Sequence, residues 1–257
     1  YINKKMGLLY ISNFLSIEEE VELLSILSSK EHQSKFPYVQ LPQRKLQNLG
    51  GIPHPTGMIE EEMPAFVQSI ERRLKKLGLL NELSLKTNSP VSHRTINQVL
   101  LNEYHSKQGI DLHQDGPLYE PFAYILSLQS SAMMELYQSR DRSFHIPDSS
   151  FLLEPRSLFL FEDKAYTHFY HGIRSGPTSF LKSSVENRDV IHYDSLSEED
   201  VSINDKLCCH RQKTRLSFTM RQVKKVVSRS FTDHENDEIK RRHAWWCESV
   251  SEKTKKV

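Results

Sequence analysis

A series of short apolar segments, separated by turn residues, constrains the fold of this sequence more than any other feature. The segments are residues 98–104, 122–128, 133–137, 150–153 and 157–161. Short apolar segments at near-regular spacing are typical of an antiparallel β-sandwich or barrel. Residues 214–223 alternate polar and apolar side chains most clearly, which indicates a strand with one buried face. The sequence therefore predicts an α+β fold that is mainly β.

The first 90 residues predict helices and a possible lid. Ser16 and Glu19 form a capping-box pattern at the start of one helix, and Pro64 suits the first turn of a second helix. We expect both helices to pack on the outside of a β core that spans residues 91–227. Residues 31–58 are polar and contain several prolines and glycines. Within it, the stretch that begins at Arg44 is interpreted as a surface loop or, alternatively, as part of a substrate lid over residues 43–55 that would present Arg44, Lys45, Gln47 or Asn48 to a substrate.

Two polar stretches interrupt or follow the β core. Residues 174–213 are rich in Ser, Asp, Glu and Lys, and this composition predicts a mobile insertion. Residues 228–257 mix both signs of charge and form a C-terminal tail. Within the tail, residues 237–249 predict a helix that carries two tryptophans.

Composition excludes several classes of protein. The net charge is +1, so any contact with nucleic acid has to be a local patch rather than a field of the whole molecule. Three cysteines with no metal or disulfide spacing fit a reducing compartment, and we expect the cytoplasm and nucleus. No apolar run reaches the length of about 18 residues that predicts a membrane span. We expect a monomer that is not bound to a membrane.

His113 and Asp115 are the candidate metal ligands with the strongest local context. They are two residues apart in an extended segment, so their side chains project from the same face. One more histidine would complete a 2-His-1-carboxylate triad, which favours non-haem Fe(II) and leaves coordination positions open. His168 and His171 compete for that place, and His171 is preferred because Gly172 allows close backbone approach. A rival His-x-Asp match begins at His192 in the polar insertion and is assigned to solvent.

The strand predicted near the C-terminal end of the core carries a second set of polar side chains. Arg215, Ser217 and Arg221 share one face of this strand with a threonine. This face is interpreted as either an amphipathic surface or a site for a small dicarboxylate, because arginine binds carboxylates through two parallel hydrogen bonds. Asn102 and Tyr104 also share a face, and both can donate hydrogen bonds to a carboxylate.

The order of these motifs resembles that of the AlkB family of Fe(II)/2-oxoglutarate dioxygenases, over about residues 8–227. The resemblance rests on Asn102-x-Tyr104, His113-x-Asp115, His171-Gly-Ile and Arg215-x-Ser-x-Thr-x-Arg221, and on the longer strings that begin at Arg44, His113 and Leu153. It implies a double-stranded β-helix, or jelly-roll, with Fe(II) bound by His113, Asp115 and His171. It also implies that O2 and 2-oxoglutarate are co-substrates.

The resemblance further implies the roles of the polar residues around the metal. Arg215 would bind the distal carboxylate of 2-oxoglutarate, helped by Tyr104 and Ser217, while Arg221 and Asn102 would lie near the carboxylate at the metal. The long insertion and the tail depart from the family pattern.

The activity implied by the resemblance is oxidative demethylation of N-methylated bases in RNA or DNA, which releases succinate, CO2 and formaldehyde. Tyr119 is expected near the mouth of the site, where an aromatic ring can stack on a base. Arg44, Gln47 and Asn48 are expected to contact the substrate from the lid. Two alternatives stay open: the same chemistry on a protein or small molecule, and a catalytically silent jelly-roll that binds nucleic acid.

Overall fold

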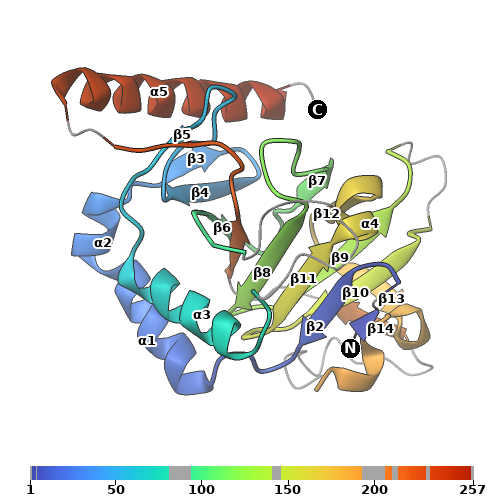
Figure 1. Ribbon diagram of the computed structural model, residues 1–257. Coiled ribbons are helices and arrows are strands. Elements are labelled where there is room, and N and C mark those ends of the chain that lie inside the picture. The colour runs from blue at the N-terminus through green and yellow to red at the C-terminus, as the bar shows by residue number, and fades with distance from the viewer. Residues whose placement is uncertain are drawn as a thin grey trace.

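The computed structural model describes residues 2–3, 5–80, 94–140, 146–192, 206–209, 214–229 and 232–255. Two antiparallel sheets face each other, with helices outside them (Figure 1). The strands are β1 (Ile2–Asn3), β2 (Leu8–Ile11), β3 (Val39–Leu41), β4 (Arg44–Leu49), β5 (Met58–Ile59), β6 (Gln98–Tyr104), β7 (Ile110–His113), β8 (Phe122–Leu128), β9 (Ala132–Tyr137), β10 (Ser149–Leu153), β11 (Leu158–Glu162), β12 (Tyr170–Ile173), β13 (Thr178–Leu181), β14 (Lys206–Cys209), β15 (Arg215–Arg221) and β16 (Val226–Val227). The helices are α1 (Ile17–Ser28), α2 (Lys30–Lys35), α3 (Ala65–Lys76), α4 (Asp163–His168) and α5 (Asp233–Lys255), with short 3-10 turns at Lys182–Ser184 and Arg188–Val190.

The major sheet has eight strands in the order β1-β2-β11-β8-β15-β6-β4-β3, and the minor sheet has four in the order β10-β9-β12-β7. The segments expected to be strands therefore form the two layers of the sandwich, with boundaries that shift by at most a residue or two. In the major sheet β15 is central, between β8 and β6, and Ser217 pairs with Asn102 on β6. The polar residues predicted on these two strands are thus direct neighbours.

The N-terminal helices cover the outer face of the major sheet. The capping box predicted at the start of α1 is present, since the side chain of Ser16 accepts from the Glu19 amide and the Glu19 carboxylate accepts from the Ser16 amide. Apolar side chains of α1 and α3 pack against the sheet in one cluster, which includes Leu23, Leu27, Ile70, Leu74, Leu101, Leu126 and Phe218. The expectation of helices outside a β core is confirmed.

A second apolar cluster fills the space between the two sheets. It includes Ile125, Phe159 and Phe161 from the major sheet and Leu136 and Phe151 from the minor sheet. Buried apolar area of this kind is the main force that holds two sheets together. The candidate metal ligands lie beside this core, because the ring of Phe161 contacts that of His171 with their centroids 4.8 Å apart.

Part of the segment expected to be an irregular loop is instead a strand of the major sheet. Residues 44–49 form β4, which pairs with β3 on one side and β6 on the other. Its polar residues resemble a loop in sequence, but Leu46, Gln47 and Leu49 are completely buried. The amide of Gln47 is satisfied by His32 and by the carbonyl group of Phe36, so its burial leaves no unpaired polar group.

The polar insertion also contains more structure than its composition predicts. Of residues 174–213, the described part includes the hairpin-like pair β13 and β14. Val185, Ile191 and Cys209 are buried against the minor sheet. Asn187 is completely buried and bonds both backbone groups of Leu152. The expectation of a mobile segment is therefore wrong for these residues. Of the rival His-x-Asp match that begins at His192, Tyr193 and Asp194 lie outside the described residues.

Most of the described part of the C-terminal tail forms one long helix, α5, which lies across the top of Figure 1 above β3 and β5. Arg242 of α5 donates to the carbonyl oxygen of Gly57, and His243 lies 2.9 Å from the Glu61 carboxylate. The ring of Trp245 meets that of His54 edge-on. The helix thus covers the segment that leads from β4 to α3. Within the described residues, no helix combines the length and the apolar character needed to cross a membrane.

Candidate active site

The minor sheet brings the predicted metal ligands together. His113 ends β7 and pairs across the strands with His171 of β12, and their ring centroids lie 4.3 Å apart. Asp115 follows two residues after His113, and the ligand atoms of all three residues lie within 4.8 Å of one another. Gly172 allows this approach, since a Cβ atom there would come within 2.9 Å of the carbonyl oxygen of Ile110. His168, the other candidate, ends α4, is exposed and does not belong to this cluster.

Two details of hydrogen bonding fit these residues to a metal ion. The Nδ1 atom of His113 donates to the carbonyl oxygen of Asp111 at 2.8 Å. This bond leaves the lone pair of Nε2 available, as in most metal-binding histidines. The Oδ1 atom of Asp115 accepts from Arg221 at 2.7 Å, whereas Oδ2 is buried and has no partner among the described residues. A buried carboxylate oxygen without a partner is costly, and a bound cation would satisfy it.

The protonation states also suit a metal site. Burial lowers the pKa of His171 to about 3, and the neighbouring His113 contributes further. Burial lowers the pKa of His113 as well. Burial would raise the pKa of Asp115, but the Arg221 guanidinium and the neighbouring imidazoles outweigh it, so the pKa lies below its usual value. At neutral pH the site therefore offers two neutral imidazoles and one carboxylate, which are the forms that bind metals.

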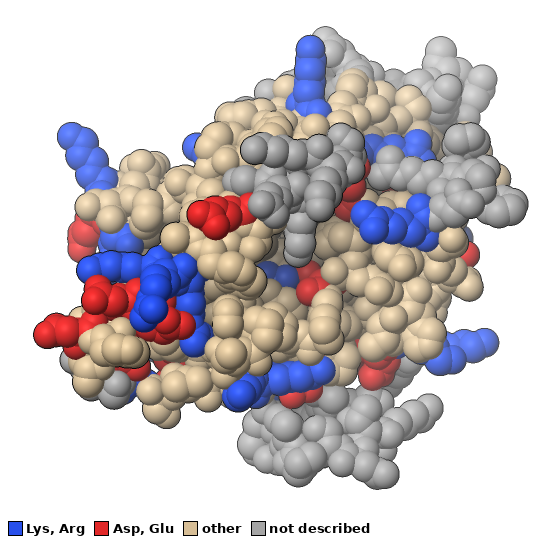
Figure 2. Space-filling model, turned by 90° about the horizontal axis from the view of Figure 1, so that it is seen from above, with Lys and Arg blue, Asp and Glu red and all other residues tan. Residues whose placement is uncertain are grey.

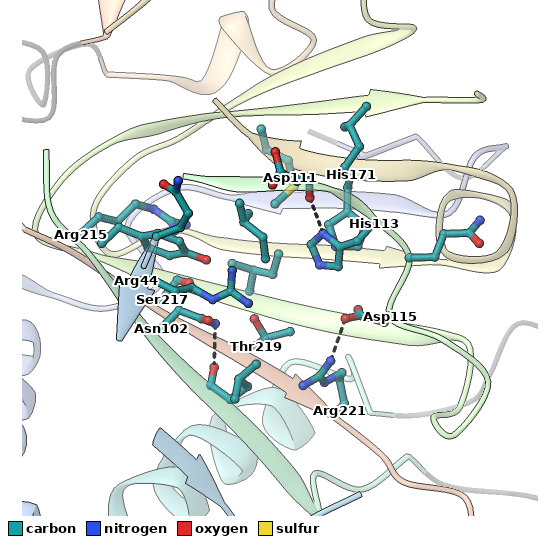
Figure 3. Close-up of a pocket in the computed structure, with 18 of the residues that line it drawn as sticks. Arg44, Asn102, Asp111, His113, Asp115, His171, Arg215, Ser217, Thr219 and Arg221 are labelled. Carbon is teal, nitrogen blue, oxygen red and sulfur yellow. Dashed lines mark hydrogen bonds and ion pairs between the residues drawn. The ribbon is translucent and has the colours of Figure 1, made fainter. Parts of the chain in front are cut away.

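Arg215 lies at the opposite end of the same cavity from the metal ligands (Figure 3). Its side chain is completely buried, donates to the hydroxyl of Ser127 at 2.8 Å and lies 5.6 Å from the ring centroid of Tyr104. Ser217 and Asn102 line the wall between Arg215 and the ligands, and each is only 3% exposed. The Oδ1 atom of Asn102 is buried without a partner among the described residues. The arrangement can bind a diacid with one carboxylate at each end.

Arg221 lies close to the metal ligands. It bonds Asp115 and also donates to Gln98 at 3.1 Å, and its guanidinium stacks 4.1 Å from the ring centroid of Tyr119. Arg221 and Asp115 are only 6% and 4% exposed as side chains. This pair therefore fixes the direction in which the carboxylate points, while leaving its second oxygen for a cation.

A cavity of about 700 Å³ contains both groups of residues. It is lined by the metal ligands, by Arg215 and Arg221, and by apolar side chains such as Leu100, Ile125 and Met134. This volume is in the range of pockets that bind whole organic ligands. The cavity can therefore hold a small diacid together with part of a second molecule.

Comparison with known proteins agrees with this geometry. Residues 7–221 match the family model of the 2OG-Fe(II) oxygenase superfamily. A relative from Danio rerio, named "Probable RNA/DNA demethylase ALKBH6", is 30% identical over 226 residues, which cover 85% of this chain and 86% of the relative. The chain belongs to the AlkB family. A solved structure entitled "The structure of OsALKBH1" superposes with a TM-score of 0.52 at 16% identity, covering 86% of this chain and all of that one.

Membership of the AlkB family confirms the predicted jelly-roll core and the activity class. The chain is an Fe(II)- and 2-oxoglutarate-dependent dioxygenase. The superfamily implies Fe(II) and 2-oxoglutarate, and the His-Asp-His cluster fits the metal ion.

The four residues predicted to bind substrate in this AlkB-family protein have different environments. Arg44 lines the cavity. Gln47, on the opposite face of β4, is buried against α2. The amide of Asn48 donates to the carbonyl oxygen of Gly51 and accepts from Gln98, next to a separate cavity under α5. Tyr119 lies against Arg221. The structure therefore brings Arg44 alone of the four into the lining of the metal-bearing cavity.

The cavity of this dioxygenase also contains residues to which the sequence assigned no role. Thr219 lies on the cavity face of β15 between Ser217 and Arg221, on the face where the alternation of that strand placed it. Arg140 lines the cavity from the turn after β9. It follows a strand of the minor sheet in a polar turn, and no motif distinguishes it from an ordinary surface arginine.

Proposed function

We propose that this dioxygenase removes methyl groups from ring nitrogens of bases in RNA or DNA. The observation that carries the proposal is the single cavity that joins the His-Asp-His cluster to Arg215 and still has room beyond a small diacid. The name of the relative from Danio rerio, a probable RNA/DNA demethylase, supports nucleic acid as the class of substrate.

In the proposed reaction, His113, Asp115 and His171 hold the metal ion, and Arg215 binds the distal carboxylate of 2-oxoglutarate. When bound, ferrous iron supplies the redox chemistry by which O2 and 2-oxoglutarate give succinate and CO2, with one oxygen atom entering succinate and the other entering the methyl group. The resulting hydroxymethyl group leaves as formaldehyde, and the ring nitrogen is restored. The protein itself positions both substrates and keeps water out, since Arg215, Asn102 and Ser217 are buried.

The surface around the cavity fits local contact with a nucleic acid. Figure 2 shows a hollow near the centre of the face seen from above, with a basic and an acidic side chain at its floor. Basic and acidic side chains are interspersed on that face, in line with the net charge of +1. Binding is therefore proposed to depend on an unpaired or flipped base that enters the cavity rather than on an extended basic surface.

The test is a screen of RNA and DNA oligonucleotides, each with one methylated base, in which formaldehyde and succinate are both measured. The expected result is one or more oligonucleotides that yield formaldehyde and raise succinate formation by the same amount. The His113→Ala variant is the control and should yield neither product. Succinate formation that no oligonucleotide stimulates would instead favour a protein or small-molecule substrate.

A further inference from the structure

Arg44 is a charged residue of the cavity for which no ion pair is found among the described residues. It begins β4 in the major sheet, and its side chain extends into the cavity between Arg215 and the metal ligands (Figure 3). The Nε atom is buried, and among the described residues no hydrogen-bond partner or ion pair is found for it. The neighbouring Lys45 points to the other side of the strand and forms an ion pair with Glu103 at 2.8 Å. The side chain as a whole is partly exposed, but a buried N–H donor without an acceptor is costly, so the position favours an acceptor from a ligand.

The other charges of the cavity do not supply that acceptor. Four arginines and two aspartates line the described cavity wall, namely Arg44, Arg140, Arg215, Arg221, Asp111 and Asp115. Arg221 is paired with Asp115, and Asp111 is exposed. Ferrous iron and 2-oxoglutarate carry opposite charges of equal size, so they cancel when both are bound. The loaded cavity therefore keeps an excess of two positive charges, and Arg44 lies near its centre.

This charge distinguishes between two classes of methylated base. Methylation of N1 of adenine or N3 of cytosine produces a cationic ring. Methylation of N3 of uracil or thymine leaves the ring neutral, with a carbonyl oxygen on each side of the methylated nitrogen, and methylation of N1 of guanine leaves it neutral with a carbonyl oxygen on one side. A guanidinium repels the first class and donates hydrogen bonds to the second, and both effects are strong where water is excluded.

We propose that Arg44 is a specificity-determining residue that selects neutral methylated bases with carbonyl oxygens, such as 3-methyluracil, over cationic ones such as 1-methyladenine. The inference rests on the proposed function and names the substrate class of the same site. It does not assign Arg44 to 2-oxoglutarate, because the fully buried Arg215 already provides a guanidinium for the distal carboxylate.

The test compares two short RNA oligonucleotides that differ in one base, 3-methyluracil or 1-methyladenine. Binding is measured by fluorescence anisotropy without O2, with Fe(II) and 2-oxoglutarate present, so that no turnover occurs. Demethylation is measured separately in air. The variants are Arg44→Gln, which removes the charge, and Arg44→Lys, which keeps it. Lys45→Gln is the matched control, because it removes a positive charge from the adjacent residue on the opposite side of β4.

The wild-type protein is expected to bind and demethylate the 3-methyluracil oligonucleotide at least about tenfold better than the other, a ratio that corresponds to ~1.4 kcal/mol. Arg44→Gln should bring this ratio close to one, whereas Arg44→Lys and Lys45→Gln should largely keep it. A wild-type preference for 1-methyladenine, or a ratio that Arg44→Gln leaves unchanged, would overturn the role of Arg44 while the proposed function stands. Equal weakening of both oligonucleotides would show a phosphate contact and would also overturn it.

Calorimetry of 2-oxoglutarate binding tests the remaining alternative, namely that Arg44 contacts the co-substrate. Its affinity should change by less than about threefold in Arg44→Gln, and a tenfold loss would assign Arg44 to the co-substrate and overturn the inference. If the wild-type protein demethylates neither oligonucleotide nor any other in the screen, the proposed function fails, and the inference fails with it.

Discussion

Replacing Arg221 by methionine is expected to destabilise the metal-free protein strongly. Arg221 and Asp115 form a direct ion pair at 2.7 Å, with 6% and 4% of their side chains exposed. Removing one partner of a buried pair leaves the other charge uncompensated, at a cost of about 3–5 kcal/mol. Because these side chains are so little exposed, solvent screening reduces this figure only slightly. Arg221→Met should therefore lose about 3–5 kcal/mol of unfolding free energy at pH 7.

The loss of unfolding free energy in Arg221→Met should also become smaller as the pH falls. With Arg221 present, the pKa of Asp115 lies below its usual value, so the pair stabilises the fold above the unfolded pKa and this contribution disappears as the pH falls through the folded pKa. Without Arg221, burial raises the pKa of Asp115, so its proton is taken up at a higher pH. The difference in stability between wild type and Arg221→Met should therefore shrink as the pH is lowered from neutrality.

Urea unfolding of the metal-free proteins provides the measurement, and a double-mutant cycle with Asp115→Asn isolates the pair. Asp115→Asn alone leaves Arg221 buried without its partner, while the double variant removes both charges, so the two losses should not be additive. A coupling energy below about 0.5 kcal/mol would refute the reasoning, since independent sites show that much. A loss in Arg221→Met that stays constant with pH would refute it as well.

Three further outcomes are expected around the same cavity. His113→Ala should abolish succinate formation while far-UV circular dichroism and the melting temperature stay close to those of the wild type, because the ligand lies at the end of a strand in an already assembled sheet. Arg215→Ala should weaken 2-oxoglutarate binding by about 2–5 kcal/mol in calorimetry, since a desolvated carboxylate loses its partner; unchanged affinity would contradict the assignment. Fe(II) binding at pH 7 should release no proton from His171, whose pKa is about 3, so the calorimetric enthalpy should not vary with the ionisation enthalpy of the buffer.

Much of the fold can be predicted from residue patterns that lie within a single strand or helix. The alternation in residues 214–223 predicts β15, and the capping box of Ser16 and Glu19 predicts the start of α1. Two of the three residues of the metal cluster are predictable for the same reason, because a two-residue spacing puts His113 and Asp115 on one face, whereas His171 joins them through the pairing of β12 with β7. The choice of His171 over His168 also agrees with the structure, in which His171 lies on β12 opposite His113 while His168 ends α4.

The features that could not be predicted depend on contacts between distant segments. Arg44, Gln47 and Asn48 belong to a strand whose neighbours are set by the sheet, and only pairing with β6 determines which side chains face the cavity. Gln47 is buried because His32 and the Phe36 carbonyl group, both before it in the chain, provide its hydrogen bonds. Asn187 is buried in the insertion for the same kind of reason, since it bonds the backbone of Leu152. The composition of a segment does not predict such hydrogen bonds to distant parts of the chain.

The two sheets contribute different parts of the cavity. The histidines belong to β7 and β12 of the minor sheet, whereas Arg215 and Arg221 belong to β15 of the major sheet. A metal ion with a bound diacid would therefore contact both sheets. Its binding would stabilise the folded protein relative to the unfolded chain by mass action. Cells short of iron would then hold a pool of this protein that melts at a lower temperature and is degraded faster, so its abundance would follow the supply of metal.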